Sequence, residues 1–202
     1  MNNEEFELIK EKYKTLTRNK SEIILELGCG LNKKNQNAIG IDKLNLKEID
    51  ISWDISKGLP FINNESVDSI YSYHFMEHID DINFLILEIN RILKKGGKFA
   101  GTVPHFSNPY YYSDPTHKTF FGLYTLCYFS KSNFFKRKVP NFYNDINFEI
   151  KNIKLNFASP FYLRNKLKKC FEKIININKY LQEFYEENLV NIIPAYEIEF
   201  EL

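Results

Sequence analysis

Four histidines lie between positions 74 and 117, and they are the residues best suited to proton transfer. They are His74, His78, His105 and His117. An imidazole ring changes its charge near neutral pH, so it can take a proton from a hydroxyl or an amine. The chain contains no His-Glu-x-x-His motif, and we expect no metal site.

A second feature with chemical potential is a glycine turn that follows an apolar stretch. Ile23–Leu27 is apolar except for Glu26, and Gly28 and Gly30 come directly after it. Glycine lacks a Cβ atom, so the backbone can turn sharply here and approach a ligand closely. A second apolar stretch ends at Asp42, whose carboxylate can accept hydrogen bonds from two ribose hydroxyls. Because ligands of open parallel sheets bind beyond the carboxyl ends of the strands, these residues predict a pocket for an adenosine-containing cofactor.

Two other nucleotide cofactors fit this pattern less well. The dinucleotide fingerprint has a third glycine at the position where this chain has Lys33. It also has an acidic residue about 20 residues after the glycines, whereas Asp42 follows Gly30 much earlier. A P-loop needs the sequence Gly-Lys-Ser/Thr, which is absent. NAD and ATP are therefore both disfavoured.

Composition bounds the class of protein and its partners. Of the 202 residues, 44% are hydrophobic and 26% are charged, which is typical of a soluble globular domain. The formal net charge of +1 argues against a nucleic-acid partner. Cys29, Cys127 and Cys170 lack paired spacing, so they indicate neither a disulfide framework nor a zinc site. No leader and no apolar run of roughly 20 residues is visible. We expect one domain over residues 1–202, without a membrane span and in the cytoplasm.

The hydrophobic pattern predicts helices and strands that alternate along most of the chain. Between the glycine turn and the second strand lies Leu31–Asn37, which is too short for the usual crossover helix. Glutamates of the final strand are expected opposite Lys151 and Lys154. Helices are expected at 4–16, from Asp80 or Asp81 to 93, at 123–129 and at 163–185. Strands are expected at 23–27, 38–41, 48–51, 67–71, 98–103, 146–157 with a bulge near Asn152, and 196–202.

Taken together, these residues resemble the class I S-adenosylmethionine (AdoMet)-dependent methyltransferases, of the small kind that act on metabolites and glycans. The motifs that carry the resemblance keep the family's order and spacing across residues 22–103. They are Leu25-Glu26-Leu27-Gly28-Cys29-Gly30, Gly40-Ile41-Asp42, Leu59-Pro60-Phe61 with Ser66-Val67-Asp68, Glu77-His78, and Glu88-x-x-Arg91-Ile92-Leu93-Lys94-Lys95-Gly96-Gly97.

The resemblance implies an α/β fold. Its sheet would be Rossmann-like, doubly wound, mostly parallel and seven-stranded, with an antiparallel C-terminal hairpin. The helices between the first strands would be abbreviated. It also implies AdoMet as cofactor and S-adenosylhomocysteine as product.

The resemblance assigns the methionine and ribose parts of AdoMet to the first two strands. Gly28 and Gly30 would let the backbone approach the methionine part. Glu26 would reach the ammonium group, directly or through water, although a buried ion pair or backbone N–H contacts are an equal alternative. Asp42 would hold the ribose hydroxyls. Because no helix follows the turn, Lys33 is a candidate partner for the methionine carboxylate.

The adenine ring and the methyl group are assigned to later residues. Asp54 would accept from the adenine amino group, and Ile55 would pack on the ring. A helix cap is the structural alternative for Asp54. Tyr73 and His74, just past the fourth strand, would border the sulfonium and the methyl group.

Methyl transfer from a sulfonium is an in-line displacement, and the acceptor must lose a proton. His74, at a strand tip, is one candidate for the base. His105 and His117 are further candidates, because they lie in the irregular stretch 104–122, and such loops are often functional. His78 matches a family position that is usually tied to packing.

The same stretch supplies candidates for acceptor contacts, namely Tyr110, Tyr112, Asp114 and Lys118. Ordinary aromatic packing is the alternative for the tyrosines. Its Asp-Pro-Thr-His and Pro-His-Phe-Ser sequences are similar to stretches in enzymes that modify surface-polysaccharide precursors. We therefore expect a small-molecule acceptor, such as a polysaccharide precursor or a metabolite bearing a phosphate or phosphoramidate, methylated on O or N.

Other acceptors and partners stay open at this point. Protein or RNA methylation and a non-catalytic AdoMet-binding role are the alternatives, and the oligomeric state is undetermined. Basic residues among aromatic ones could bind an anionic substrate or a membrane surface, or simply form a solvated face. They are Lys131, Lys136, Arg137, Lys138, Lys166, Lys168 and Lys169.

Overall fold

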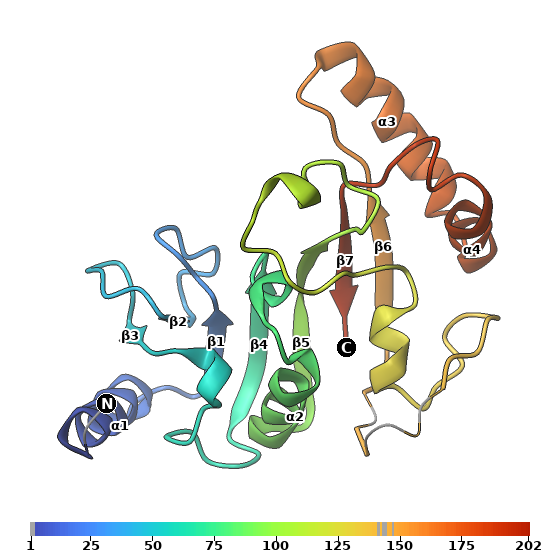
Figure 1. The fold of residues 1–202 in the computed structure, drawn as a ribbon. Helices are drawn as coiled ribbons and strands as arrows, with labels where there is room; N and C mark the ends of the chain where they lie inside the picture. The colour runs from blue at the N-terminus through green and yellow to red at the C-terminus, as the bar shows by residue number, and fades with distance from the viewer. Residues whose placement is uncertain (1–2, 141, 143–144, 147) are drawn as a thin grey trace. The chain divides into compact units, whose positions relative to one another are not determined.

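The structure is a computed structural model that describes residues 3–140, 142, 145–146 and 148–202. Its strands form one seven-stranded sheet in the order β3-β2-β1-β4-β5-β7-β6 (Figure 1). The chain divides into two compact units, Met1–Ala100 and Gly101–Leu202, which we describe in turn. The strand order, parallel at β1 and antiparallel at the C-terminus, confirms the predicted Rossmann-like α/β class.

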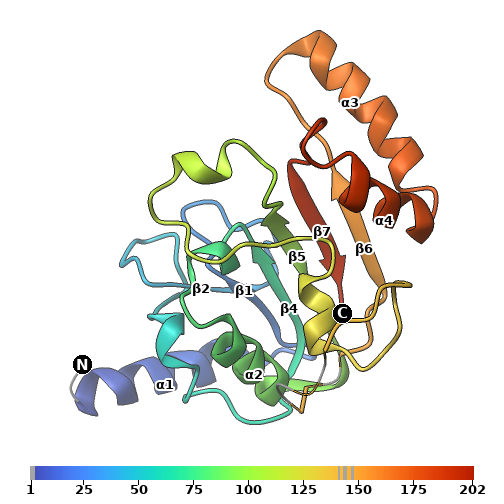
Figure 2. The ribbon, with the colours of Figure 1, turned by 45° about the vertical axis from the view of Figure 1, so that its right-hand side comes forward.

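The first unit holds the parallel part of the sheet. β1 pairs in parallel with β2 on one side and with β4 on the other, and β2 pairs with β3. Leu25, Leu27 and Ile41 are fully buried, as expected for strands of a parallel sheet. Figure 2 shows β1, β2 and β4 side by side. The strands are β1 (Ile24–Leu27), β2 (Ile39–Asp42), β3 (Ile51–Ser52), β4 (Val67–Tyr73) and β5 (Leu93–Pro104), which continues into the second unit.

The helices of the first unit are α1 (Asn3–Thr17), η1 (Ile55–Lys57), η2 (Met76–His78) and α2 (Ile82–Ile92). The carboxylate of Asp81 accepts the Phe84 N–H at 2.9 Å, which confirms the predicted cap of α2. As expected, no helix lies between β1 and β2. Helix α2 ends at Ile92 with Leu93 as its C-cap, within one residue of the predicted end. The predicted start of β5 at position 98 was wrong, because the chain becomes extended at the buried residue Leu93.

An ion pair on α2 fixes the loop that precedes β4. The Nε and Nη2 atoms of Arg91 donate to the two carboxylate oxygens of Glu88 at 2.9 and 2.8 Å. Glu88 also accepts the Leu59 N–H at 2.9 Å, and Arg91 donates to the Leu59 and Ile62 carbonyls at 3.0 and 2.9 Å. Glu88 and Arg91 of the family motif therefore hold the backbone of this loop in place.

The second unit contains η3 (Tyr111–Ser113), η4 (Thr125–Phe129), β6 (Asn152–Asn156), α3 (Tyr162–Ile175), α4 (Lys179–Asn188) and β7 (Glu197–Glu201). β6 and β7 pair in antiparallel register, with Lys154 opposite Glu199 and their charged groups 3.9 Å apart. This confirms the final strand and one predicted cross-strand pair. The other was wrong, since the side chain of Lys151 pairs with Glu149 at 2.7 Å.

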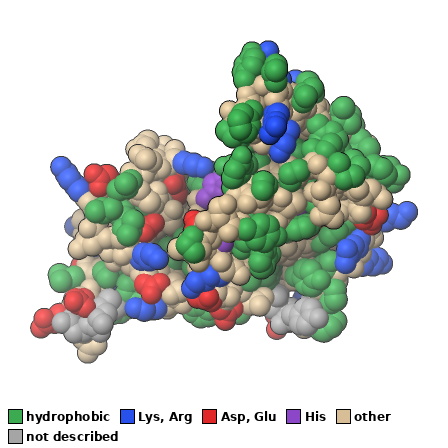
Figure 3. Space-filling view, turned by 45° about the horizontal axis from the view of Figure 1, so that its top comes forward, with side chains coloured by type: hydrophobic (Ala, Val, Ile, Leu, Met, Phe, Trp, Pro, Cys, Tyr) green, Lys and Arg blue, Asp and Glu red, His purple; other side chains and the backbone are tan. Residues whose placement is uncertain are grey.

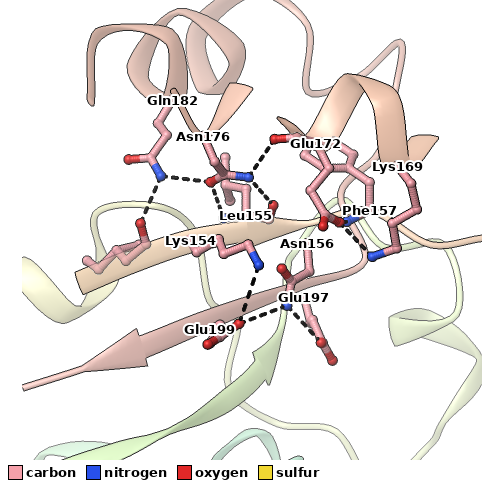
Figure 4. Close-up of polar contacts among 11 residues, drawn as sticks. Lys154, Leu155, Asn156, Phe157, Lys169, Glu172, Asn176, Gln182, Glu197 and Glu199 are labelled. Carbon is pink, nitrogen blue, oxygen red and sulfur yellow. Dashed lines mark hydrogen bonds and ion pairs between the residues drawn. The ribbon is translucent and has the colours of Figure 1, made fainter. Parts of the chain in front are cut away.

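Two longer elements predicted for this unit are shorter in the structure. Strand β6 covers only part of the predicted strand 146–157, of which residue 147 lies outside the described residues. The single predicted helix is two helices, because Asn176 uses its side chain to bond both backbone groups of Leu155, at 2.9 and 2.7 Å (Figure 4). Asn178 then caps α4 by accepting the Leu181 N–H at 2.9 Å.

None of the helices in the described part of the chain combines the length and the apolarity needed to cross a membrane.

Candidate functional site

The turn after β1 has the backbone conformation that its glycines allow. Gly28 and Gly30 have positive φ angles, +66° and +54°, which residues with side chains rarely adopt. The N–H of Gly28 donates to the Ile41 carbonyl at 2.8 Å and ties the turn to β2. A Cβ atom on Gly28 would lie 2.2 Å from the Phe75 ring, whereas one on Gly30 would meet nothing within 4 Å. The backbone at Gly30 therefore faces open space.

Asp42, at the end of β2, lies beside this turn. Its Oδ2 atom accepts the Gly30 N–H at 3.0 Å, and its Oδ1 atom accepts the Leu44 N–H at 3.1 Å. The side chain is partly buried, and each carboxylate oxygen can accept a second hydrogen bond. The structure thus brings Gly30 and Asp42 together, and the ribose contact of Asp42 stays a prediction.

Glu26, which is 2% exposed, is bonded by the short segment that follows the turn. Its Oε1 accepts the Lys34 N–H at 2.9 Å, and its Oε2 accepts the Asn35 N–H at 2.8 Å. These backbone contacts are the structural alternative that the sequence left open. The carboxylate holds the segment that stands in place of a crossover helix, and its contact with an ammonium group stays a prediction.

Lys33 has a partner other than the one considered from the sequence. Its ammonium group lies 2.6 Å from the carboxylate of Asp50, which also accepts the Gly40 N–H at 2.7 Å. Nearby, burial and then neighbouring carboxylates raise the pKa of the Cys29 thiol to about 11. The thiol is therefore protonated at neutral pH and is not a nucleophile.

Asp54 caps the short helix η1. Its Oδ1 accepts the Ser56 hydroxyl at 2.6 Å and the Ser56 N–H at 3.2 Å. These hydrogen bonds lower the pKa of Asp54. The cap is the alternative considered from the sequence, and it coexists with the predicted adenine contact, which stays a prediction. Ile55 is buried next to it, and its contact with adenine is likewise a prediction.

The tip of β4 carries a histidine with an unusual backbone. His74 has a φ angle of +52°, which is uncommon for a residue other than glycine. Its Nδ1 atom lies 3.6 Å from Oε1 of Glu77. Glu77 is 1% exposed, and its Oε2 has no hydrogen-bond partner among the residues that the structure describes. Strained backbone and unsatisfied buried polar groups both concentrate at functional sites.

Tyr73 connects this tip to the segment after β1. The ammonium group of Lys34 lies 4.2 Å from the centre of the Tyr73 ring, a cation–π contact. Because the backbone of Lys34 is held by Glu26, this one residue joins the ends of β1 and β4. The structure therefore brings the predicted cofactor residues Glu26 and Tyr73 together.

In the second unit, His105 is completely buried. Its Nδ1 lies 2.8 Å from the Ser107 hydroxyl and 3.1 Å from the Ser107 N–H, and its Nε2 lies 3.0 Å from Glu186. An N–H can only donate, so Nδ1 accepts and Nε2 carries the proton that bonds to Glu186. With both nitrogens bonded, a role for His105 as base requires this loop to rearrange.

His117 has one nitrogen fixed and one beside a carboxylate. Its Nδ1 donates to the Tyr111 carbonyl at 2.9 Å, and its Nε2 lies 3.7 Å from Asp114. Since Nδ1 carries the proton, a further proton would be taken by Nε2, where the carboxylate can stabilise the charge. The surroundings of His117 therefore suit a base better than those of His105.

The four residues predicted to bind the acceptor lie on one loop. Tyr110 and Tyr112 are 50% and 66% exposed, and the Tyr112 hydroxyl donates to a carbonyl of its own loop at 3.0 Å. Asp114 accepts the Thr116 N–H and hydroxyl at 2.8 and 2.6 Å, and Lys118 is exposed. Their contact with an acceptor stays a prediction.

Comparisons with known proteins bear directly on this fold. Residues 33–101 match the sequence model of a family described as a methyltransferase domain. The matched segment, about a third of the chain, is thus similar to a methyltransferase domain. The match supports the predicted enzyme class. AdoMet as cofactor stays a prediction. A search of curated proteins found none that matches.

Several solved structures, among them methyltransferases, resemble this chain in fold. An AdoMet-dependent methyltransferase from Archaeoglobus fulgidus is 17% identical, with a TM-score of 0.55 over 96% of this chain and 92% of that chain. The YcgJ protein from Bacillus subtilis is 12% identical, with a TM-score of 0.54 over 96% and 97%. Phosphoethanolamine N-methyltransferase 2 from Haemonchus contortus, solved with S-adenosyl-L-methionine, is 16% identical, with a TM-score of 0.51 over 95% and 51%.

The first unit of the chain has features that fit AdoMet. The open space at Gly30 admits a ligand close to the backbone, and Asp42 offers acceptor oxygens beside it. Sequence reasoning missed Glu77 as a partner of His74, because Glu77 was used only as part of a family motif and was given no role of its own. The signal was present, since Glu77 follows His74 by three residues directly after a predicted strand.

Proposed function

We propose that this protein transfers the methyl group of AdoMet to a small phosphate-bearing acceptor. The part of this proposal that concerns the cofactor rests on the hydrogen bond from the Gly30 N–H to Asp42, at 3.0 Å, beside open space at Gly30. In this arrangement the backbone at Gly28 and Gly30 would bind the methionine part, and Asp42 the ribose hydroxyls. The remaining cofactor contacts would come from Glu26, Asp54, Ile55 and Tyr73.

The part of the proposal that concerns the methyl acceptor rests on the side chains of one loop and on one resemblance in fold. The loop 104–122 offers His117, Lys118 and exposed tyrosines to an acceptor. One similar fold belongs to a protein named as a phosphoethanolamine N-methyltransferase. We infer that the acceptor is a metabolite or surface-polysaccharide precursor that bears a phosphate or phosphoramidate group and is methylated on O or N.

AdoMet supplies an electrophilic methyl group. The acceptor's nitrogen or oxygen attacks the methyl carbon, the carbon–sulfur bond breaks with its electron pair going to sulfur, and the acceptor releases a proton. We assign that proton to His74, which follows the tip of β4. The Glu77 carboxylate, 3.6 Å from Nδ1, would orient the ring and stabilise the imidazolium. Its buried position makes this attraction less screened than at the surface.

His117 is a second candidate for the base. Its Nδ1–H is bonded to a carbonyl, which leaves Nε2 as the basic nitrogen next to Asp114. A base on the loop that we propose for the acceptor would let the same loop bind the acceptor and take its proton. Single substitutions of His74 and of His117 by glutamine distinguish the two candidates. The base is the residue whose loss lowers turnover without weakening AdoMet binding.

The proposal is tested by incubating the protein with AdoMet and three separate acceptor pools: small metabolites, proteins and RNA. S-adenosylhomocysteine is measured by mass spectrometry. We expect product with the metabolite pool, and we expect phosphatase treatment of that pool to abolish it. Activity confined to the protein or RNA pool would favour a macromolecular acceptor. AdoMet binding without product in any pool would identify a binding protein.

A further inference from the structure

The second unit contains a hollow of about 230 Å³ that the cofactor site does not use. Four segments that are far apart in the sequence line it, namely 108–110, 158–161, 194–196 and the first two turns of α3. Tyr110, predicted from the sequence to bind the acceptor, is one of the lining residues. The lining is mixed, with aromatic, proline and alanine groups beside two cations. Such a combination is typical of a small-molecule pocket.

Hydrogen bonds hold one wall of this hollow in a fixed shape. The carbonyl of Tyr196 accepts the side-chain amide of Asn108 at 2.9 Å and the backbone N–H of His105 at 3.2 Å. The N–H of Ala195 lies 2.8 Å from the hydroxyl of Tyr185 and 3.1 Å from that of Ser107. Asn108 is only 4% exposed. The wall is therefore pre-formed.

Helix α3, which carries the two cations, is anchored to β6 at its other end. The carboxylate of Glu172 accepts the N–H of Phe157 at 2.7 Å and the ammonium group of Lys169 at 2.8 Å (Figure 4). Asn176 adds bonds to both backbone groups of Leu155. The helix therefore presents its first turns to the hollow from a fixed position.

The two cations, Arg164 and Lys168, are four residues apart and share one face of α3. Neither pairs with a carboxylate within 3–140, 142, 145–146 and 148–202. Lys168 donates to the Pro194 carbonyl at 3.0 Å, and burial lowers the pKa of Lys168. The Arg164 guanidinium lies 4.9 Å from the centre of the Phe161 ring. Lys168 is partly buried and Arg164 is exposed, and two neighbouring cations without a counter-charge favour an anionic ligand.

The start of α3 adds to this positive character. Phe161 is the N-cap residue and provides no side-chain hydrogen bond to the first turn. The backbone N–H groups of an uncapped helix end attract anions. In Figure 3, basic side chains stand among hydrophobic ones at the top of the view, where α3 begins. The exposed hydrophobic residues there include Phe161, Tyr162 and Leu163.

We propose that this hollow binds the phosphate monoester group of a ligand, held by Arg164 and Lys168, with Tyr110 and Phe161 against the apolar part. A guanidinium group binds phosphate through two parallel hydrogen bonds, and a second cation suits its double negative charge. The phosphate monoester could belong to a soluble metabolite or to a lipid headgroup such as phosphatidic acid. That this ligand is the methyl acceptor rests on the proposed function, whereas the anion site does not.

The test measures binding of phenyl phosphate, with phenol and benzoate as ligands of the same ring and lower charge. We expect phenyl phosphate to bind, phenol not to bind, and benzoate to bind at least about tenfold more weakly. Arg164→Gln should weaken phenyl phosphate by about tenfold. Lys166→Gln removes the same charge from the same helix, but Lys166 lies over Tyr162 and outside the lining, so binding should be unchanged.

A parallel arm measures co-sedimentation with vesicles of phosphatidylcholine and phosphatidic acid in equal parts. The protein could bind the vesicles but not phenyl phosphate, with Arg164→Gln abolishing the vesicle binding. That result would keep the anion site and assign its ligand to a lipid. The inference is overturned if neither probe binds, if benzoate matches phenyl phosphate, or if Lys166→Gln has the same effect as Arg164→Gln. AdoMet titrations of the same samples report separately on the proposed function.

Discussion

The carboxylate of Asp42 accepts the backbone N–H of Gly30 at 3.0 Å and so joins the end of β2 to the glycine turn after β1. One side chain therefore takes part both in shaping the turn and, on our proposal, in binding ribose. The two roles are separable, because an amide oxygen can still accept the Gly30 N–H but attracts ribose hydroxyls less strongly than a carboxylate.

Asp42→Ala should abolish AdoMet binding in isothermal titration calorimetry, because it removes the proposed ribose contact and loosens the turn. Asp42→Asn should keep the thermal midpoint near that of the wild type while weakening AdoMet by about tenfold or more. Glu48→Ala, which removes an exposed carboxylate elsewhere in the first unit, is the control for loss of charge. Wild-type affinity in Asp42→Ala would refute the cofactor assignment.

Glu77→Gln should lower turnover about tenfold or more while leaving AdoMet binding within twofold of the wild type. The reason is that a neutral amide cannot stabilise the imidazolium of His74. A purely structural role for Glu77 would not move the pH profile, so the diagnostic reading is the acidic limb of turnover against pH. We expect that limb to shift to lower pH, because loss of the carboxylate makes the imidazolium easier to deprotonate. An unmoved limb would argue against His74 as the base.

His105 and His117 should respond differently to substitution by alanine. His105 is fully buried between Ser107 and Glu186, so His105→Ala should lower the free energy of unfolding by about 3 kcal/mol. His117→Ala should cost less stability and reduce turnover, with AdoMet binding preserved. Urea unfolding and steady-state kinetics on both variants separate the effects. If both variants keep full rate, the loop 104–122 is not the catalytic region.

Local features of the cofactor site could be predicted from the sequence because they depend on neighbouring residues. Positive φ angles at Gly28 and Gly30 follow from glycine spacing, and the missing crossover helix follows from counting residues. The competing roles of Glu26 and Asp54 could be named but not decided. Their backbone partners come from the folded arrangement of segments whose conformation no periodic pattern specifies.

Features that depend on distant contacts could not be predicted. The break between α3 and α4 occurs at Asn176, where bonds to Leu155 on β6 override a continuous apolar period. The anion site draws on four segments, and only Tyr110 of its lining was singled out as an acceptor contact. Lys168 was named only within a larger set of basic residues that could bind an anion or form a solvated face, and Arg164 was not named, since periodicity does not reveal what a helix faces.

Glu88→Gln should destabilise the protein by about 2 kcal/mol at neutral pH, because the pair with Arg91 holds the loop before β4. The hydrogen bond from Arg91 lowers the pKa of Glu88 below its usual 4.5. The stabilisation is thus complete above the unfolded-state pKa and is lost as pH falls through the lower folded-state value. Urea unfolding should show the two proteins converging as the pH falls through the folded-state pKa of Glu88. Glu48→Gln, an exposed control, should match the wild type at every pH.

Deleting residues 196–202 should make the protein insoluble, because β7 lies between β5 and β6 in the sheet rather than at its edge. Its removal leaves the backbone of β6 unpaired over the register Asn152–Asn156 and frees the facing side of β5. Unpaired strand edges associate with one another. Glu199→Gln removes only the exposed ion pair to Lys154, which at the surface contributes little, so it should stay soluble. The soluble fraction after centrifugation distinguishes the variants, and a soluble, active truncation would contradict the place of β7 in the sheet.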